Sequence, residues 1–247
     1  MSAIQSYTYK ISSYHTDDSG RLFVYQLLNF LQDTAHNHAD GAGYGQKQLV
    51  DKDLFWVLSR LTIEISSLPK HGDEIILSTW VKSIRGAISE REFSIVCNDQ
   101  VVINASSLWF SIAGDSHKPA RLPSDYSDLM VLNEAYATTG GSEKVAEAED
   151  QKDKSTGIHV TARYSDIDMV DHVNNATYAR WMMDEVPTDY QQQNEIKKLD
   201  INYLGECFMG DELEVNHVLE DQTLLVHEVV NLRTANVICR SQSVWEQ

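Results

Sequence analysis

The feature that most constrains the fold of this chain is an internal repeat. The segment LTIEISSLPKHGDEIILSTWV, which begins at Leu61, aligns without a gap with LDINYLGECFMGDELEVNHVL, which begins at Leu199. Both segments contain the tripeptide Gly-Asp-Glu. Further along, VVINASSLWF at 101–110 matches VICRSQSVWE at 237–246, with tryptophan on tryptophan.

A third match lies near the start of each half, where YHTDDSGRL (14–22) aligns with YSDIDMVDH (164–172). Three matches in the same order predict a duplicated unit. Each copy also shows an alternating strand, a helix with an apolar stripe near the helical period, and then three or four strands. In the first copy we expect a helix at 21–38 and strands at 7–14, 55–65, 74–82, 90–97 and 101–112. In the second copy we expect a helix at 174–185 and strands at 157–164, 198–203, 212–219, 223–233 and 236–245.

The segment between the copies, 138–155, is rich in Gly, Ser and charge and contains no aromatic residue. Such a composition cannot bury apolar surface and predicts a linker. We therefore expect a first unit at 1–137 and a second at 156–247. A helix followed by antiparallel strands buries the helix on one face of its sheet. The predicted fold class is α+β, with two such units side by side whose joined sheets cover exposed edges.

Charge and composition limit the partners of the chain. The formal net charge is −17, and it is uneven: up to Tyr126 there are 11 Lys/Arg against 14 Asp/Glu, and the remainder has 9 against 23. So acidic a surface repels phosphate backbones, so we expect no nucleic-acid partner. Three cysteines without C-x-x-C spacing indicate reduced thiols and no metal site. Without an apolar signal core or a membrane-spanning run, we expect a cytoplasmic protein with no membrane partner.

The densest group of polar side chains lies where a predicted strand gives way to a helix. Seven of the thirteen residues from Arg163 to Asn175 carry candidate chemistry, namely Arg163, Asp166, Asp168, Asp171, His172, Asn174 and Asn175. A helix N-terminus offers unpaired N–H groups to a developing oxyanion. A histidine beside a carboxylate suits general acid–base work. A polar helix cap is the alternative reading, but two consecutive asparagines exceed what a cap needs.

The repeat separates the two copies chemically. Aligned on the tyrosine-led motif, Asp168 faces Asp18 and His172 faces Leu22; aligned on the Gly-Asp-Glu turn, Glu206 faces Leu68. The second copy alone would then keep an acid–base pair. Glu206 lies at a strand end within an apolar pattern, so we expect burial to raise its pKa; an exposed surface glutamate is the alternative.

The pattern D-x-D-x-x-x-H-V-N-N-x-x-Y-x-x-W, with a later Glu-Cys, resembles the acyl-acyl-carrier-protein thioesterases of plant plastids and bacteria. The resemblance spans essentially the whole chain and implies a tandem hotdog fold. It places the site on Asp168, His172 and Glu206, with Cys207 following. One position departs, because the family's asparagine two residues before the histidine is Val170 here. Either a neighbour such as Asn174 or a backbone N–H replaces its hydrogen bonds, or activity is weaker or redirected.

The resemblance implies hydrolysis of a fatty acyl thioester on acyl-carrier protein, without a cofactor, in a bacterial fatty acid pathway. Glu206 would activate water, and His172, oriented by Asp168, would hold that water or protonate the leaving thiolate. A covalent route through Asp168 or Glu206 stays open. Asn174, Asn175 and Arg163 would support the site. The first unit would bind the acyl chain through seven residues: Leu22, Tyr25, Leu28, Leu31, Phe55, Trp56 and Leu58.

Two further expectations concern access to the site. The first copy has extra residues around DGAGYGQKQLVDKD (40–53), which predict a mobile Gly-rich loop over the far end of the acyl chain. An acidic carrier protein would need a basic patch to dock on. The candidates are Lys197 with Lys198, and a cluster of Lys82, Arg85 and Arg91.

Two other functions stay open on the sequence. An acyl-coenzyme A thioesterase would keep the fold and would need a basic pocket for the ligand's phosphates. A non-catalytic acyl-chain binder is kept open by Val170, which cannot donate or accept a side-chain hydrogen bond. Pairing of the chain into a homodimer is also left open.

Overall fold

A computed structural model gives the arrangement of residues 3–123, 129, 131–148 and 155–247. The chain forms two compact units, Met1–Ser142 and Glu143–Gln247. Their boundary lies within the predicted linker, of which 149–154 are outside the described residues. The described part of the linker has no helix or strand, but it is packed: the side chain of Val145 is buried and its N–H donates to Asn202 Oδ1 at 2.9 Å. The expectation that this segment buries no apolar surface was therefore wrong.

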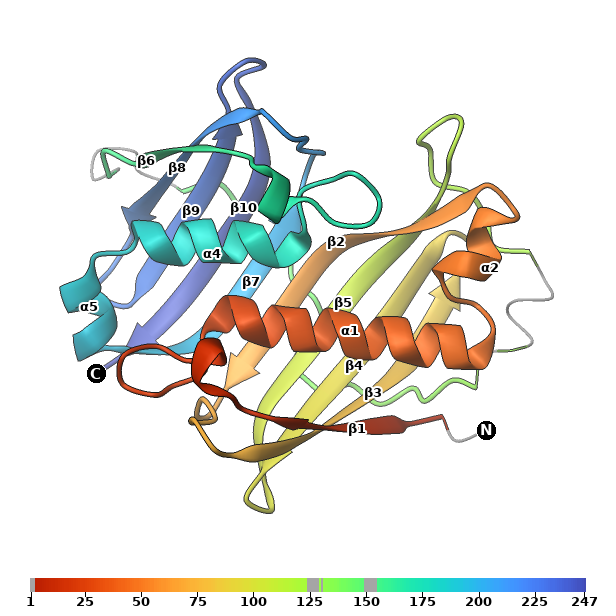
Figure 1. Ribbon diagram of the computed structural model, residues 1–247, viewed down its shortest axis with the longest axis horizontal. Helices are drawn as coiled ribbons and strands as arrows, with labels where there is room; N and C mark the ends of the chain where they lie inside the picture. Colours follow the sequence, from red (N-terminus) through yellow and green to blue (C-terminus); the bar gives the residue numbers. More distant parts are fainter. Residues whose placement is uncertain (1–2, 124–128, 130, 149–154) are drawn as a thin grey trace. The chain divides into compact units, whose positions relative to one another are not determined.

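The first unit is a long helix packed on a five-stranded antiparallel sheet (Figure 1). Its strands follow the order β1-β3-β4-β5-β2, with hydrogen-bonded neighbours antiparallel. The helix α1 (Val24–Ala42) buries a stripe at helical spacing that includes Leu27, Leu31 and Thr34. The remaining elements are β1 (Gln5–Lys10), α2 (Gln46–Val50), β2 (Leu54–Ile65), β3 (Glu74–Arg85), β4 (Ile88–Cys97) and β5 (Gln100–Ala113), with a short 3-10 turn at Ser13–His15.

The second unit repeats this plan with a shorter helix. Its strand order is β7-β10-β9-β8-β6, again antiparallel, and α4 (Asn175–Glu185) packs on β8 and β9. The other elements are β6 (Ile158–Thr161), a 3-10 turn at Tyr164–Asp166, α5 (Thr188–Gln193), β7 (Glu195–Tyr203), β8 (Glu212–Leu219), β9 (Leu224–Asn231) and β10 (Asn236–Glu246). Each predicted helix and strand has a counterpart, and the α+β class is confirmed in each unit.

The duplication extends to individual hydrogen bonds. Trp109 Nε1 donates to Ser107 Oγ at 2.8 Å in β5, and Trp245 Nε1 donates to Ser243 Oγ at 2.8 Å in β10. The alignment of the two tryptophans read from the sequence therefore holds in three dimensions.

The Gly-rich segment after the first helix is not a mobile loop. The helix continues through Asp40 and Gly41 to Ala42 and ends at Gly43, whose φ of 85° is the left-handed cap that glycine favours. The next residues form α2, and Tyr44 and Leu49 are buried in one apolar cluster with Leu54, Val81 and Leu122. Buried anchors such as Tyr44 make the segment part of the core.

Candidate active site

The candidate site is a loop between a 3-10 turn and the first turn of α4. Backbone hydrogen bonds close this loop: Asp168 N–H donates to the carbonyl oxygen of His172 at 2.9 Å, and Asn174 N–H donates to the carbonyl oxygen of Asp166 at 2.8 Å. Asn174 caps α4, because its Oδ1 accepts the N–H of Ala176 at 2.9 Å. The geometry fixes His172 two residues before the helix cap.

A second backbone contact carries His172 to Glu206. The N–H of Val173 donates to the carbonyl oxygen of Cys207 at 2.9 Å, which joins the histidine loop to the segment after β7. His172 Nε2 and Glu206 Oε1 lie 3.7 Å apart, and the side chains are 30% and 45% exposed. The ring of Phe208 packs against the imidazole with centroids 4.9 Å apart. The structure thus brings together the two predicted acid–base residues, which are far apart in sequence.

Glu206 is 45% exposed, so the expectation that this side chain is buried was wrong. Leu204 and Phe208, which made the surrounding pattern look interior, are themselves 52% and 43% exposed. The segment leaves the sheet after Tyr203 and turns outward. Exposure places the carboxylate where water can reach it directly.

Asp168 holds the loop rather than the imidazole. Its Oδ1 accepts the N–H of Val170 at 2.9 Å, an Asx turn. Among the described residues, no hydrogen bond joins its carboxylate to the His172 ring; the two residues are linked through the backbone instead. In this structure Asp168 therefore sets the position of His172 by shaping the loop.

The remaining predicted residues of this region fall into different positions. Arg163 is exposed, and its N–H donates to Asp166 Oδ2 at 2.8 Å. The carbonyl oxygen of Asn175 accepts the hydroxyl of Tyr203 at 3.1 Å. Val170 is 44% exposed at the loop tip. Since the Asn174 oxygen caps the helix, that side chain is not a ready replacement for an amide at position 170.

Cys207 lacks the features of a nucleophile. Its side chain is buried, and burial raises the pKa of the thiol to about 12. A nucleophilic cysteine needs its pKa lowered instead. Cys207 is better described as a small packing residue beside Tyr178.

The structure shifts the alignment of the two copies by one residue at this loop. In the first unit, Asp17 N–H donates to the carbonyl oxygen of Arg21 at 2.8 Å, the same bond that joins Asp168 to His172. Asp168 therefore matches Asp17, not Asp18, and His172 matches Arg21, not Leu22. Arg21 Nε pairs with Asp17 Oδ2 at 3.3 Å. The first copy replaces the histidine by a charged arginine, while the correspondence of Glu206 with Leu68 stands.

Of the seven predicted acyl-chain residues, those with aliphatic side chains are buried in the first unit and the aromatic ones are partly exposed. The buried ones are Leu22, Leu28, Leu31 and Leu58, and the partly exposed ones are Tyr25, Phe55 and Trp56. Trp56 Nε1 donates to the carbonyl oxygen of Tyr44 at 3.3 Å. Burial of this kind is also what a core requires, so contact with an acyl chain stays a prediction.

Most members of the two predicted basic patches are paired or buried, whereas Arg85 is exposed. Lys82 Nζ lies 3.1 Å from Glu90 Oε2 and 3.8 Å from the centre of the Tyr136 ring, and Arg91 is buried inside the first unit. Lys197 Nζ pairs with Glu195 at 2.7 Å, and Lys198 Nζ pairs with Glu143 at 2.9 Å. These pairings reduce the charge that either set offers, and docking of a carrier protein on them stays a prediction.

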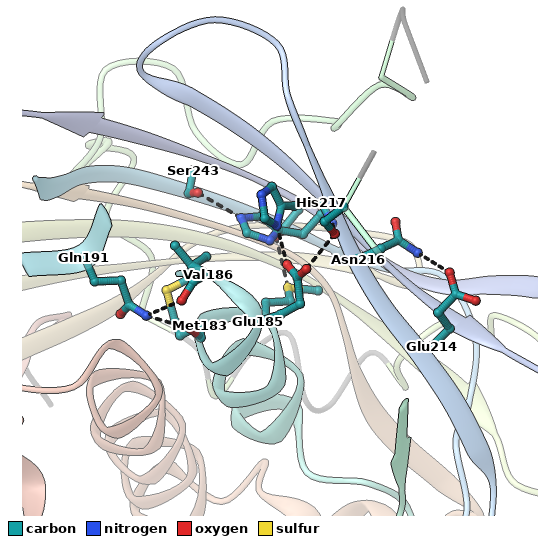
Figure 2. Close-up of polar contacts among 12 residues, drawn as sticks. Met183, Glu185, Val186, Gln191, Glu214, Asn216, His217 and Ser243 are labelled. Atoms are coloured by element: carbon teal, nitrogen blue, oxygen red, sulfur yellow. Dashed lines mark hydrogen bonds and ion pairs between the residues drawn. The ribbon is translucent and has the colours of Figure 1, made fainter. Parts of the chain in front are cut away.

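A second polar cluster in the same unit had no signal in the sequence. Figure 2 shows Glu185, at the end of α4, pointing to His217 on β8; Glu185 Oε2 pairs with His217 Nδ1, and Glu185 Oε1 accepts the hydroxyl of Ser155 at 2.6 Å. His227 is buried beside them, with Nε2 3.0 Å from Ser243 Oγ. These residues come from separate parts of the sequence and form no motif, so only the pairing of the strands and the packing of α4 could reveal the group.

Asp166, at the base of the histidine loop, is also tied to the helix. Its carboxylate is 5% exposed and pairs with Arg180 on α4, which is 36% exposed. We predict that Asp166→Asn lowers the free energy of unfolding by about 2 kcal/mol, because it removes the charge that Arg180 pairs with in a buried position. Urea unfolding at neutral pH measures the loss. The control is Asp189→Asn on the surface helix α5, which should change the free energy of unfolding by less than about 0.5 kcal/mol. Equal losses in the two variants would reject a stabilising role for the Asp166–Arg180 pair.

Two successive units, each a helix on an antiparallel sheet, define a tandem hotdog protein. The family model of the acyl-ACP thioesterase N-terminal domain matches residues 4–130, and that of the C-terminal domain matches residues 148–247. The chain belongs to the acyl-ACP thioesterase family.

Solved structures and curated sequences agree with this assignment. An acyl-ACP thioesterase from Bacteroides thetaiotaomicron superposes with a TM-score of 0.88 at 28% identity, covering 99% of this chain and 98% of that one. The 12:0-ACP thioesterase from Umbellularia californica has the same fold, with a TM-score of 0.88 at 20% identity, over 100% of this chain and 98% of that one. A chloroplastic palmitoyl-acyl carrier protein thioesterase from Gossypium hirsutum is 28% identical over 82% of this chain and 52% of its own length. The chain spans about half the length of such curated relatives.

None of the helices in the described part of the chain is long and apolar enough to span a membrane. In the same residues, no group of three or more His, Cys, Asp or Glu side chains is placed to hold a metal ion.

Proposed function

We propose that the chain hydrolyses the thioester between a fatty acyl group and acyl-carrier protein, releasing the free fatty acid. The observation that carries the proposal is the approach of His172 Nε2 to Glu206 Oε1, 3.7 Å apart, on two side chains that are 30% and 45% exposed near the start of α4. Family membership and the activities for which the relatives are named support the same reaction. A bacterial, cytoplasmic setting and pairing into a homodimer remain predictions.

His172 Nε2 is buried and has no hydrogen-bond partner within the residues that the structure describes, although the side chain as a whole is 30% exposed. A nitrogen and an oxygen 3.7 Å apart do not hydrogen-bond directly, and we propose that a small rotation of either side chain admits a water that contacts both. We assign Glu206 the role of general base: it takes a proton from the water, whose oxygen bonds to the carbonyl carbon. The carbon–sulfur bond then breaks, and His172, in its protonated form, gives a proton to the leaving thiolate. The proton that Glu206 took from the water then passes to His172, which restores both side chains. The acid and the thiol are the products.

The oxyanion of the tetrahedral intermediate needs donors that the fold has not already used. The N–H of Ala176 is taken by the Asn174 side chain, and that of Thr177 donates to the Asn174 carbonyl oxygen at 2.9 Å. Among the described residues, the N–H of Asn175 donates to no acceptor. We therefore propose this N–H, at the positive end of the α4 dipole, as the oxyanion donor.

The carrier of the acyl group is tested by a ladder of substrates. Purified protein is incubated with acyl-carrier-protein thioesters of increasing chain length and with the matching coenzyme A thioesters, and the released acids are identified. The proposal expects release from the carrier protein with the higher kcat/KM. Equal or faster release from coenzyme A would move the assignment to an acyl-coenzyme A thioesterase. No release from either would leave an acyl-chain-binding protein.

Position 170 offers a test by gain of activity. We predict that Val170→Asn raises kcat about tenfold, because an amide on the loop supplies a hydrogen bond of about 1 kcal/mol or more that valine cannot make. The exposed side chain leaves room for the change, and the backbone N–H keeps its bond to Asp168. Met169→Asn, next to it and 89% exposed, is the control and should leave kcat unchanged. An unchanged kcat in Val170→Asn would show that this site does not need the side-chain hydrogen bond that the family's asparagine can make.

A further inference from the structure

Arg91 is a charged side chain placed inside the first unit. It lies on β4, is 6% exposed, and its guanidinium faces α1, where Nη1 is 2.8 Å from His38 Nδ1. The same Nη1 donates to Thr79 Oγ1 at 3.2 Å, and Tyr44 lies close to the guanidinium. Thr79, His38 and Tyr44 are all buried.

The partners of this guanidinium carry no negative charge. Burial, with Arg91 nearby, lowers the pKa of His38 to about 4, so at neutral pH His38 is an uncharged acceptor. Threonine and tyrosine hydroxyls are also neutral. No carboxylate of the described residues forms an ion pair with Arg91. A buried charge is normally paired, because leaving water costs several kcal/mol per ion. Arg91 departs from that rule.

The repeat shows that the fold does not demand an arginine here. Arg91 lies opposite Ser107 in β5, and Leu225 lies opposite Ser243 in β10. Ser107 and Ser243 are equivalent because each accepts the indole N–H of its tryptophan. The equivalent of Arg91 in the second unit is therefore Leu225, which is 2% exposed. The same architecture is built with an apolar side chain, so the arginine serves something other than the fold.

The position of the cluster connects it with the predicted acyl-chain residues. His38 belongs to the buried stripe of α1 that also contains Leu28 and Leu31. Seven residues separate Leu31 from His38, about 10 Å along a helix. An acyl chain lying along this stripe would pass from apolar side chains to a guanidinium. The guanidinium has five N–H donors suited to oxygen acceptors.

We propose that Arg91 binds an oxygen atom on the distal part of the acyl chain, as a hydroxyl, keto or carboxyl group, so that the enzyme selects oxygenated fatty acyl groups over unsubstituted ones. The proposal rests on the thioesterase function and on acyl-chain binding in the first unit. A site built to hydrogen-bond a substrate oxygen discriminates strongly against the analogue that lacks it, since buried donors are then left unpaired.

The experiment compares acyl-carrier-protein thioesters of one chain length, unsubstituted or with a single hydroxyl moved stepwise toward the methyl end. The wild-type protein should show a kcat/KM at least about tenfold higher for one hydroxylated chain than for the unsubstituted chain. Arg91→Leu, which copies the second unit, should bring this ratio close to one and raise kcat/KM for the unsubstituted chain. Arg121→Leu removes an exposed arginine of the same unit and should keep the wild-type ratio.

Two results would overturn the proposal: a wild-type ratio of one or less at every hydroxyl position, or the same ratio in Arg91→Leu. If Arg91→Leu does not fold, Arg91→Gln replaces it, and the wild-type series still decides. Calorimetric binding of free hydroxylated and unsubstituted fatty acids separates the two hypotheses. Absence of hydrolysis on every thioester, with tighter binding of the hydroxylated acid, would reject the thioesterase function and keep the Arg91 site. Hydrolysis of hydroxylated and unsubstituted thioesters with equal kcat/KM would keep the thioesterase function and reject the Arg91 site.

Discussion

Glu206→Gln is expected to lower kcat for acyl-carrier-protein thioesters about a thousandfold, within the range for loss of a general base. Glutamine keeps the size and hydrogen-bonding reach of the side chain but cannot take the proton of the attacking water. The side chain is 45% exposed, so the change should leave the fold intact. KM should stay within about twofold, because the carboxylate is assigned to the chemical step. Steady-state kinetics with circular dichroism as a check on folding measures both.

The companion variant is His172→Asn, expected to lose a similar factor. Since the two residues are proposed to act together in one proton-transfer sequence, Glu206→Gln/His172→Asn should be little slower than either single variant. Glu212→Gln, an exposed glutamate at the start of β8, is the matched control and should keep wild-type kcat. Wild-type kcat in Glu206→Gln would reject the assigned base, and multiplicative losses in the double variant would reject joint action.

The fold was predictable because the sequence contains two copies of the same order of helix and strand patterns. Alternating strands and an apolar helical stripe give the elements of each unit, and the repeated Gly-Asp-Glu turn aligns β3 with β8. The pairing of His172 with Glu206 was also predictable, since both stand in the family pattern. The alignment of the two copies was wrong where it depended on a single shared residue. The tyrosine at 14 and 164 set a register one residue off, and only the backbone bond from Asp17 to Arg21 corrected it.

Burial of polar residues could not be predicted from composition. Glu206 has apolar neighbours in sequence, which suggested burial. Leu204 and Phe208 are themselves exposed, so the whole turn lies at the surface. Arg91 looked like surface charge, yet strand alternation turns it toward α1. The Glu185–His217 pair joins a helix end to a strand and depends on register alone. In each case the local pattern fixes the element, while the tertiary packing decides which side of it meets water.

A strong pH dependence of stability is expected from His227, which is fully buried on β9. Burial, with His217 adjacent, lowers its pKa from 6.5 to about 3. The groups that face it are the His217 imidazole, itself paired with Glu185, and the hydroxyl of Ser243. Below pH 6.5 the unfolded chain takes up a proton at this histidine and the folded chain does not. Its contribution is therefore complete above pH 6.5 and is lost progressively as the pH falls toward 3.

Between pH 7.5 and pH 5 this one residue should remove about 2 kcal/mol from the free energy of unfolding. His227→Phe should lack that loss, and the repeat shows that the site accepts the ring: the strand registers place Phe93, 2% exposed, at the equivalent position of the first unit. Urea unfolding of both proteins at the two pH values gives the difference. His159→Gln, an exposed histidine of the same unit, should follow the wild-type slope. Parallel pH profiles for wild type and His227→Phe would mean that the buried imidazole already carries a proton in the folded state, in which case the neighbouring Glu185 carboxylate, and not burial, governs it.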